Sequence, residues 1–431
     1  MDRSISNRKK ITECPLDSDP STFFTAFLFV SAIIGIATMI IATEYFGHDS
    51  FLTLTSHKPS DKPAHLMPNM YPEPFGVHYF GDFLDTLKHS TIKDTLSNPY
   101  MSPAGYPPFS FIVIAPFQLF SYHDSLKLYI ILTALLLTIP IWKSRKTLSI
   151  SNRVLFVSSL FLSAPLIATF DRGNIQGIVV GFALIGLGAF KQGRHFQAGF
   201  WFAISAAMKG YPVLLLLLLV KSRSWNALGL SILLGTFFTW SSFQYFDGFS
   251  VSSLEHLWNS VAGFRTDSSS ILTDRNHSFR GGISALSIVG PIWLSRILNI
   301  FEHNYYIFLL VLFSFLTTLI VSKSTPLFNS VIYISILLSY GIGISYGYSQ
   351  LFLFLVVLTI PDKSSPSSLD TWVAIGGTAF LLAPKPLSFC QGIATYTIID
   401  PVVALLILLI IVPKDIQRLQ TSLPFRYFNP K

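Results

Sequence analysis

The sequence predicts an all-α polytopic membrane protein. Of the 431 residues, 51% are hydrophobic and 12% are charged, about half the share of roughly 25% that is typical of soluble domains. The shortage of charge extends along the whole chain, whereas a secreted protein would confine it to one signal segment. The first apolar run, residues 23–42, is long enough to span a bilayer and is not followed by a small-residue cleavage site, which predicts a retained helix.

The basic residues gather in short loops between apolar runs, and this pattern predicts the topology. Cytoplasmic loops of membrane proteins carry an excess of Lys and Arg. The net charge of +8 therefore indicates membrane orientation, and no nucleic-acid partner is expected. The basic stretches expected on the cytoplasmic side are residues 8–10, 143–146, 191–195, 221–223 and 414–418, together with Lys323 and Lys363.

Two apolar runs are too weak to count as crossings. Residues 109–120 are short and contain Pro116, and residues 283–294 are similarly short, so both are expected to be re-entrant or interfacial. About twelve spans remain, with both termini in the cytoplasm. Several of them are short, which is typical of broken helices around a cavity. The expected divisions are a cytoplasmic tail over residues 1–22, one transmembrane domain over 23–413 and a second cytoplasmic tail over 414–431.

Polar residues that interrupt the apolar runs are predicted to meet on the outer side. The same side carries the two long stretches outside the membrane, about residues 44–106 and 246–304. Ionisable residues at membrane depth are costly, so each is a candidate functional residue. Their common level in the membrane predicts one cavity that opens outward. The segments concerned are Asp82, residues 105–108, residues 171–176, Lys209, residues 276–281 and residues 345–350.

Several of these segments also have a purely structural interpretation. Asp171 and Arg172 are consistent with an interfacial ion pair, and Lys209 with a side chain that snorkels from a helix end. Tyr346 and Tyr348 are consistent with interfacial aromatic residues. Single residues therefore do not decide between a site and a membrane boundary.

Residues 78–90 have apolar side chains at helical spacing, which predicts an amphipathic helix. In the simplest interpretation this helix lies on the membrane surface, with Asp82 and Asp85 in solvent. The same helix would also be able to hold an acid over the mouth of the cavity, so both interpretations stay open.

An ordered set of motifs resembles a known family. Residues 81–83 (GDF), 106–117 (YPPFSFIVIAPF), 173–176 (GNIQ), 198–223 and 276–281 (NHSFRG) are similar, in this order, to motifs of bacterial membrane glycosyltransferases with a C-type fold. That family includes the mycobacterial polyprenyl-phosphate-mannose-dependent α-1,2-mannosyltransferases and a branching arabinofuranosyltransferase. One departure is that no His follows His303, although family members often carry a late-helix His where this chain has 345–350 (SYGYSQ). Either this role is absent from the chain, or Gln350, Ser349 or His277 supplies it.

The resemblance implies an enzyme that transfers a sugar, mannose or a pentose, with inversion. The implied donor is a polyprenyl-phosphate sugar, the acceptor is a glycan or glycolipid, and the site lies on the outer face of the cell membrane. Topology supports this donor independently, because nucleotide sugars are cytoplasmic. Asp82 is the expected base and Asp85 the second choice, and no cofactor or metal is expected. Donor phosphate is assigned to Lys209, Arg172 and Arg280, and sugar or acceptor to Asn174, Gln176, Asn276, His277, Tyr106, Tyr346 and Gln350.

Two other classes remain as alternatives. A polytopic transporter or flippase for lipid-linked glycans also needs many spans and intramembrane charge, but it predicts sites near the bilayer midplane and inverted repeats. An enzyme similar to O-antigen ligases would favour a pyrophosphate donor and a larger outer loop.

Overall fold

The computed structural model describes residues 19–46, 80–90, 106–246, 248–266, 276–341, 345–361, 368–385, 389–390 and 393–422. Within these ranges the regular structure is helical, apart from one antiparallel pair of two-residue strands, β1 (Phe389–Cys390) and β2 (Ile393–Ala394). The predicted all-α class is therefore confirmed. The basic residues 8–10, Lys363 and most of the stretch 44–106 lie outside the described residues.

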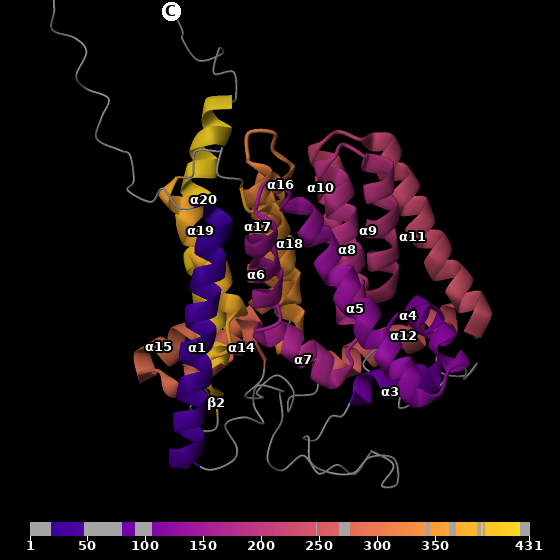
Figure 1. The fold of residues 1–431 in the computed structure, drawn as a ribbon, viewed down its shortest axis with the longest axis horizontal. Helices are drawn as coiled ribbons and strands as arrows, with labels where there is room; N and C mark the ends of the chain where they lie inside the picture. Colours follow the sequence, from indigo (N-terminus) through magenta and orange to yellow (C-terminus); the bar gives the residue numbers. More distant parts are fainter. Residues whose placement is uncertain are drawn as a thin grey trace, which may run out of the picture.

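The helices, including short 3₁₀ helices labelled η, run the length of the described chain (Figure 1). In order they are α1 (Pro20–Phe46), α3 (Gly81–His89), α4 (Pro108–Ile114), η2 (Ala115–Leu119), α5 (Tyr122–Ser144), α6 (Ile150–Leu160), α7 (Ala164–Arg172), α8 (Gln176–Lys191), α9 (His195–Lys209), η3 (Tyr211–Leu216), α10 (Leu217–Lys221), α11 (Trp225–Phe246), α12 (Val251–Thr266), α14 (Phe279–Val289), α15 (Ile292–His303), α16 (Tyr305–Val321), α17 (Leu327–Tyr340), η4 (Gly347–Phe352), α18 (Leu353–Thr359), α19 (Leu369–Leu382) and α20 (Thr395–Ser422).

Three of the described helices, α1, α5 and α20, are long and apolar enough to cross a membrane. The number rises to five if two bent pairs each form one span: α6 with α7 at 60°, and α15 with α16 at 73°. Many of the other apolar helices are shorter. Gly210 and Pro212, for example, interrupt the apolar run between α9 and η3. The structure supports a membrane protein, while about twelve spans remains a prediction.

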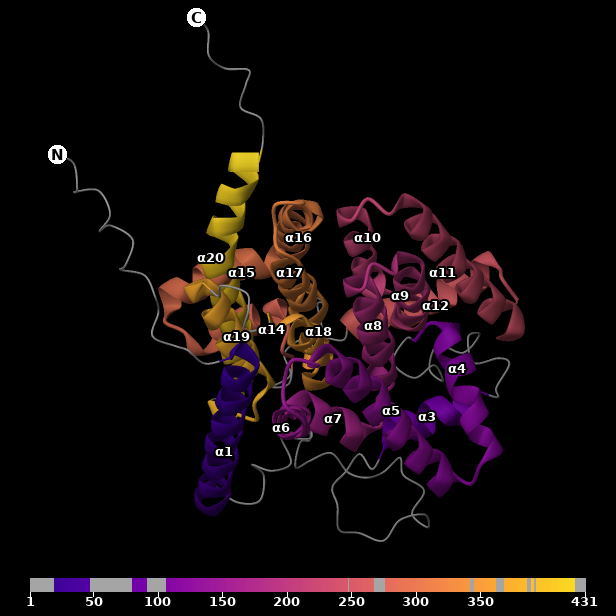
Figure 2. The same cartoon turned by 45° about the horizontal axis from the view of Figure 1, so that its top comes forward.

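The two runs excluded from the span count form short helices. Residues 109–120 fall in α4 and η2, and residues 283–294 extend from α14 into α15 across Pro291. In Figure 1 the short helices α3, α4, α7, α12, α14 and α15 gather at the lower end of the bundle. We call this the site end. Figure 2 shows α1, α19 and α20 grouped on one side and α8 to α11 on the other, with α16, α17 and α18 between them.

Helices α8, α17 and α18 form the core of the bundle. Nearly all side chains of α17 and α18, and most of those of α8, are buried. A helix buried on all sides carries apolar residues all round, in place of one apolar stripe. Two polar positions lie at the start of these helices: Gln176 is the first residue of α8, and η4 directly precedes α18. Both are therefore fixed at the ends of rigid elements.

The basic loops of the described chain lie together at the opposite end, which we call the basic end. Arg145 Nη1 donates to the carbonyl of Ile360 at 2.8 Å, and Lys191 Nζ donates to that of Leu358 at 3.0 Å. Lys221 Nζ donates to the carbonyl of Thr325, between α16 and α17, at 2.7 Å. The cations thus satisfy carbonyl groups that a helix end leaves without partners.

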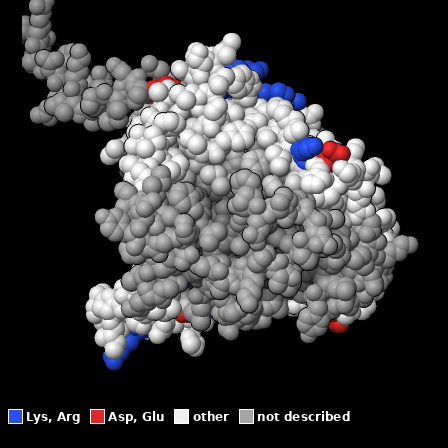
Figure 3. Space-filling model, turned by 60° about the horizontal axis from the view of Figure 1, so that its bottom comes forward, with Lys and Arg blue, Asp and Glu red and all other residues white. Residues whose placement is uncertain are grey.

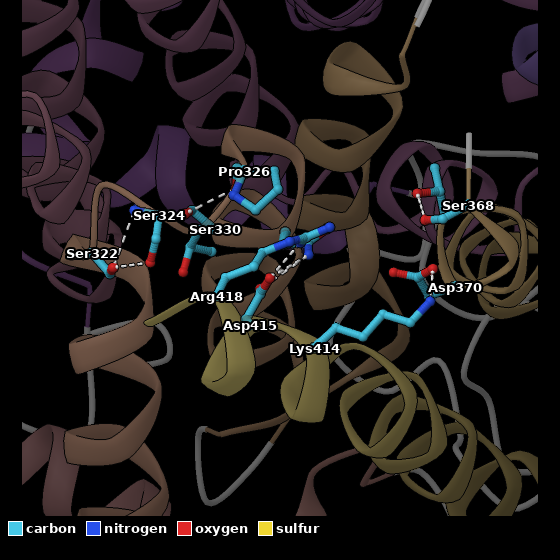
Figure 4. A network of polar contacts seen from close by, with 12 residues as sticks. Ser322, Ser324, Pro326, Ser330, Ser368, Asp370, Lys414, Asp415 and Arg418 are labelled. Atoms are coloured by element: carbon cyan, nitrogen blue, oxygen red, sulfur yellow. Dashed lines mark hydrogen bonds and ion pairs between the residues drawn. The ribbon is translucent and has the colours of Figure 1, made fainter. Parts of the chain in front are cut away.

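A buried network at the basic end fastens α20 to its neighbours (Figure 4). Asp415 is wholly buried and accepts hydrogen bonds from Asn329 at 3.0 and 3.2 Å, from Tyr333 at 2.7 Å and from Arg418 at 2.7 Å. Both partners from α17 therefore hold the last helix in one position. Buried charges in proteins are stable only when paired in this way.

Candidate active site

Asp82 lies in the first turn of α3, and this helix is fixed against protein. Phe83 and Leu87 are buried, and the Phe83 ring lies 5.6 Å from the ring of Phe117 and 4.7 Å from that of Tyr129. The predicted amphipathic helix is confirmed. Phe83 packs on η2 and α5, so part of the apolar face of the helix rests on protein. The interpretation in which the helix lies on the membrane surface stays a prediction.

The Asp82 carboxylate accepts hydrogen bonds from the two residues that flank Gly173. Arg172 donates from Nε to Oδ2 at 3.0 Å and from Nη2 to Oδ1 at 3.1 Å, and Asn174 Nδ2 donates to Oδ2 at 2.6 Å. Two parallel bonds from one guanidinium fix both the position and the plane of a carboxylate. The side chains of Asp82 and Arg172 are 20% and 17% exposed, so the pair is shielded but open to a ligand.

Gly173 shapes the turn that brings both donors to Asp82. It ends α7 with φ of 65°, in the left-handed region that glycine adopts without cost. A Cβ atom at this position would lie 2.7 Å from Cβ of Phe83. The missing side chain therefore permits both the turn and the close approach of α7 to α3.

The amide of Asn174 joins Asp82 to Lys209. Its Oδ1 accepts hydrogen bonds from Lys209 Nζ at 3.2 Å and from the backbone N of Gln176 at 2.9 Å. Its Nδ2 donates to the Tyr106 hydroxyl at 3.0 Å as well as to Asp82. Both Oδ1 contacts come from groups that only donate, so the orientation of the amide is determined. Asn174 is wholly buried, and one amide thus fixes the spacing between the carboxylate and the ammonium group.

Tyrosine rings cover the two cations. Lys209 Nζ lies 4.9 Å from the ring centroid of Tyr106 and 5.4 Å from that of Tyr348, and Arg172 Cζ lies 5.6 Å from Tyr348 and 5.8 Å from Tyr346. Such contacts stabilise a cation at low water content. Burial, reinforced by the charge of Asp82, raises the pKa of Tyr106 well above its ordinary value, so this phenol stays protonated.

A second polar cluster surrounds Asp400 in α20. Its Oδ2 accepts a hydrogen bond from Gln350 Nε2 at 2.6 Å and lies 3.0 Å from His277 Nδ1. Lys385 Nζ lies 3.0 Å from Oδ1, at an ion-pair distance but not at a hydrogen-bond angle. The ring of Tyr396 stacks on His277 with the centroids 4.2 Å apart. Burial lowers the pKa of His277, against the opposing influence of Asp400, which favours a neutral imidazole.

The two clusters share the segment 345–350. Tyr346 and Tyr348 face Arg172, while Gln350 reaches Asp400 and His277. Ser345 and residues 276–277 are joined by backbone contacts: Ser345 N donates to Asn276 Oδ1 at 2.9 Å, and His277 N donates to the Ser345 carbonyl at 2.7 Å. The segment therefore links α20, through Gln350 and Asp400, to the rings that face Arg172.

Most of the predicted site residues fall into these clusters. Arg280 lies elsewhere: its guanidinium faces the rings of Tyr305 and Tyr306, at 6.0 and 5.9 Å. The first cluster holds Asp82, Tyr106, Arg172, Asn174, Gln176, Lys209 and Tyr346, and the second holds Asn276, His277 and Gln350.

Sequence analysis missed Asp400, Lys385, Tyr396 and Tyr211. Asp400 carried a usable signal, because it is an acid inside an otherwise apolar run that continues to residue 412. Tyr211 follows Lys209 in an unusual KGYP sequence and donates from its hydroxyl to Gln176 Oε1 at 2.6 Å.

Asp400→Ala is expected to lower the free energy of unfolding by about 3–5 kcal/mol, because it leaves the buried groups around it without their acceptor. Thermal unfolding of the full-length protein in detergent measures this. Asp124→Ala serves as the control, because the Asp124–Lys127 pair is 59% and 72% exposed and such pairs contribute about 1 kcal/mol or less. Equal losses in the two variants would contradict a structural role for the Asp400 cluster.

Figure 3 views the molecule toward the site end. In the view toward this end, the described Lys and Arg residues that are visible lie at the margins of the face (Figure 3). Within the described residues no group of three or more His, Cys, Asp or Glu side chains is placed to hold a metal ion. The first cluster offers one carboxylate, two cations, amides and phenols.

Comparison with known proteins gives one match. The sequence model of glycosyltransferase family 87 matches residues 105–339, more than half of the chain. Searches of the curated proteins and of the solved structures found no significant match.

Proposed function

Because the chain belongs to glycosyltransferase family 87, we propose that it transfers a sugar from a polyprenyl-phosphate donor to a glycan or glycolipid acceptor, with inversion. The proposed sugar is mannose or a pentose, and the proposed site is the first cluster, on the outer face of the cell membrane. One observation carries the proposal: in a chain with only 12% charged residues, a carboxylate that is paired with a guanidinium is joined to an ammonium group through one buried amide.

In the proposed reaction Asp82 is the base. The acceptor hydroxyl gives its proton to the Asp82 carboxylate, and its oxygen forms a bond to the anomeric carbon of the donor sugar. The bond between that carbon and the phosphate oxygen breaks on the opposite face, and polyprenyl phosphate leaves with the electron pair. A carboxylate fixed within hydrogen-bond reach of the acceptor is suited to this task. Hydrogen bonds from Arg172 and Asn174 hold the Asp82 carboxylate in place.

In the same proposal Lys209 stabilises the departing phosphate. Negative charge on the leaving oxygen grows as the bond breaks, and a preorganised cation lowers the energy of that state. The ammonium group donates a hydrogen bond to one amide oxygen and lies over two tyrosine rings. These neutral partners bind a cation more weakly than a phosphate does. Arg172 is already paired with Asp82, so we assign it mainly to orientation of the base.

The donor class follows from the proposed sidedness. The basic end would face the cytoplasm under the positive-inside rule, and the first cluster belongs to α3 and α7 at the opposite end. Nucleotide sugars do not reach that face, whereas sugars carried on polyprenyl phosphate do. A C-type glycosyltransferase fold is part of the same proposal.

An assay with the full-length protein in nanodiscs tests the function. We expect transfer from synthetic polyprenyl-phosphate mannose or a polyprenyl-phosphate pentose, and none from the matching nucleotide sugars. Absence of transfer from every polyprenyl-phosphate sugar, together with movement of the lipid-linked sugar across liposomes that contain the protein, would establish the transporter alternative.

Gly173→Ala is expected to reduce transfer by roughly 10–100-fold, because a displacement of about 1 Å at a catalytic group has effects of that size. The added Cβ collides with Phe83 and so shifts Arg172 and Asn174, the two residues that donate hydrogen bonds to Asp82. Gly193→Ala is the matched control: its φ of 73° is equally unfavourable, but nothing lies within 4 Å of the added Cβ. Initial rates of the two variants, compared with their thermal stabilities, separate displacement of the site from backbone strain.

A further inference from the structure

Two amides at the start of α8 are oriented by two donors from one turn. Lys209 donates to Asn174 Oδ1, and Tyr211 donates to Gln176 Oε1. Gly210, between the two donors, has φ of 75° and reverses the chain where α9 ends. The spacing of the donors along the turn thus matches the spacing of the amides, two residues apart in each case.

The NH2 groups of the two amides differ in their hydrogen bonds. Asn174 Nδ2 has acceptors in Asp82 and Tyr106. Gln176 is wholly buried, and its Nε2 has no hydrogen-bond partner among the described residues. The Tyr211 hydroxyl occupies Oε1 at 2.6 Å, which leaves Nε2 as the open donor of this amide.

An unsatisfied buried donor is costly, and native proteins carry few of them. The atom is closed to bulk water in this state. Lys209 belongs to the same set of contacts, because its ammonium group and the Gln176 backbone N share Asn174 Oδ1. The dipole of α8, which begins at Gln176, adds positive potential at this point. An electron-rich oxygen of a substrate fits these surroundings.

We propose that Tyr211 is a positioning residue, and that it holds Gln176 so that Nε2 donates a hydrogen bond to an acceptor oxygen of the lipid-linked donor. The inference rests on the proposed function and deepens it: Gln176, already assigned to the sugar or acceptor, receives a defined ligand atom, and Tyr211 is added as a residue that acts through Gln176. The oxygen belongs either to the phosphate or to a hydroxyl of the sugar, and the two sources are separated by experiment.

The experiment measures binding of two probes to the full-length protein in nanodiscs: polyprenyl phosphate and polyprenyl-phosphate mannose. Gln176→Leu is expected to raise the Kd by roughly tenfold, the size of a lost hydrogen bond in a buried site. A rise for both probes identifies a phosphate oxygen, and a rise for the mannosylated probe alone identifies a sugar oxygen. Gln176→Glu keeps the shape and the Tyr211 contact but loses the donor, and it is expected to weaken binding at least as much.

Tyr211→Phe is expected to raise the same Kd by roughly three- to tenfold in the wild-type background and to have no further effect in the Gln176→Leu background. A merely structural tyrosine would give additive effects. Tyr333→Phe is the control, because it also removes a buried hydroxyl that binds a side chain, but at the basic end; its Kd should match that of the wild type.

Three outcomes decide the matter. Unchanged Kd in both Gln176 variants overturns the ligand role, and additive effects of Tyr211→Phe and Gln176→Leu overturn the positioning role. In both cases a wild-type protein that still transfers sugar leaves the proposed function intact. If the wild-type protein neither binds the probes nor transfers sugar, the proposed function fails and this inference fails with it.

Discussion

Asp82→Asn is expected to reduce sugar transfer by about 10²–10⁴-fold, the usual contribution of a general base. The variant keeps the shape of the side chain and one oxygen that accepts a hydrogen bond from Arg172. The lost property is the ability to take a proton. Initial rates with polyprenyl-phosphate mannose and a glycolipid acceptor measure the effect, and binding of polyprenyl phosphate should change little.

The matched control is Asp124→Asn, which makes the same change at an exposed position at the start of α5. Its activity should equal that of the wild type. Asp85→Asn distinguishes the two acids of α3. Loss of transfer in that variant, with Asp82→Asn still active, would assign the base to Asp85.

Lys209→Met is expected to lower kcat by about 10²–10³-fold, as removal of one preorganised group that stabilises developing charge does in other enzymes. Methionine keeps an unbranched apolar side chain against Tyr106 and Tyr348 but has no charge. Because the phosphate gains charge mainly in the transition state, kcat should fall much more than the affinity for polyprenyl phosphate.

Lys221→Met provides the comparison for Lys209. Lys221 is also a lysine near a helix end, but it binds backbone carbonyls at the basic end. Its loss should reduce thermal stability and leave kcat unchanged. A Lys209→Met enzyme with full kcat would remove Lys209 from the leaving-group role.

The class of the fold was predictable because composition and apolar run length act over many residues. The bends within the apolar runs were not predictable, because hydropathy does not show where a run changes direction. Residues 154–170 read as one apolar run, yet the chain turns by 60° between α6 and α7, with Pro165 in the first turn of α7. Similarly, Pro291 separates α14 from α15 in a run that is apolar on both sides.

The members of the first cluster were predictable as a group, because each interrupts an apolar run. Their pairing was not: nothing in the sequence indicates that Arg172 binds Asp82, 90 positions away. The resemblance suggested roles for single residues but not the network around Asn174. The second cluster was seen only in part, because its centre, Asp400, lies in the final apolar run, and Lys385 pairs with it across a separate loop.

The 3₁₀ geometry of η4 makes the segment sensitive to its length. With three residues per turn, Tyr348 and Gln350 project in directions about 120° apart. One short segment therefore places Tyr348 against Arg172 and Gln350 against Asp400. Insertion or deletion of a single residue here would rotate one of the two side chains away from its partner, whatever amino acid is used. The length of this stretch is therefore as important to the two clusters as the side chains that it carries.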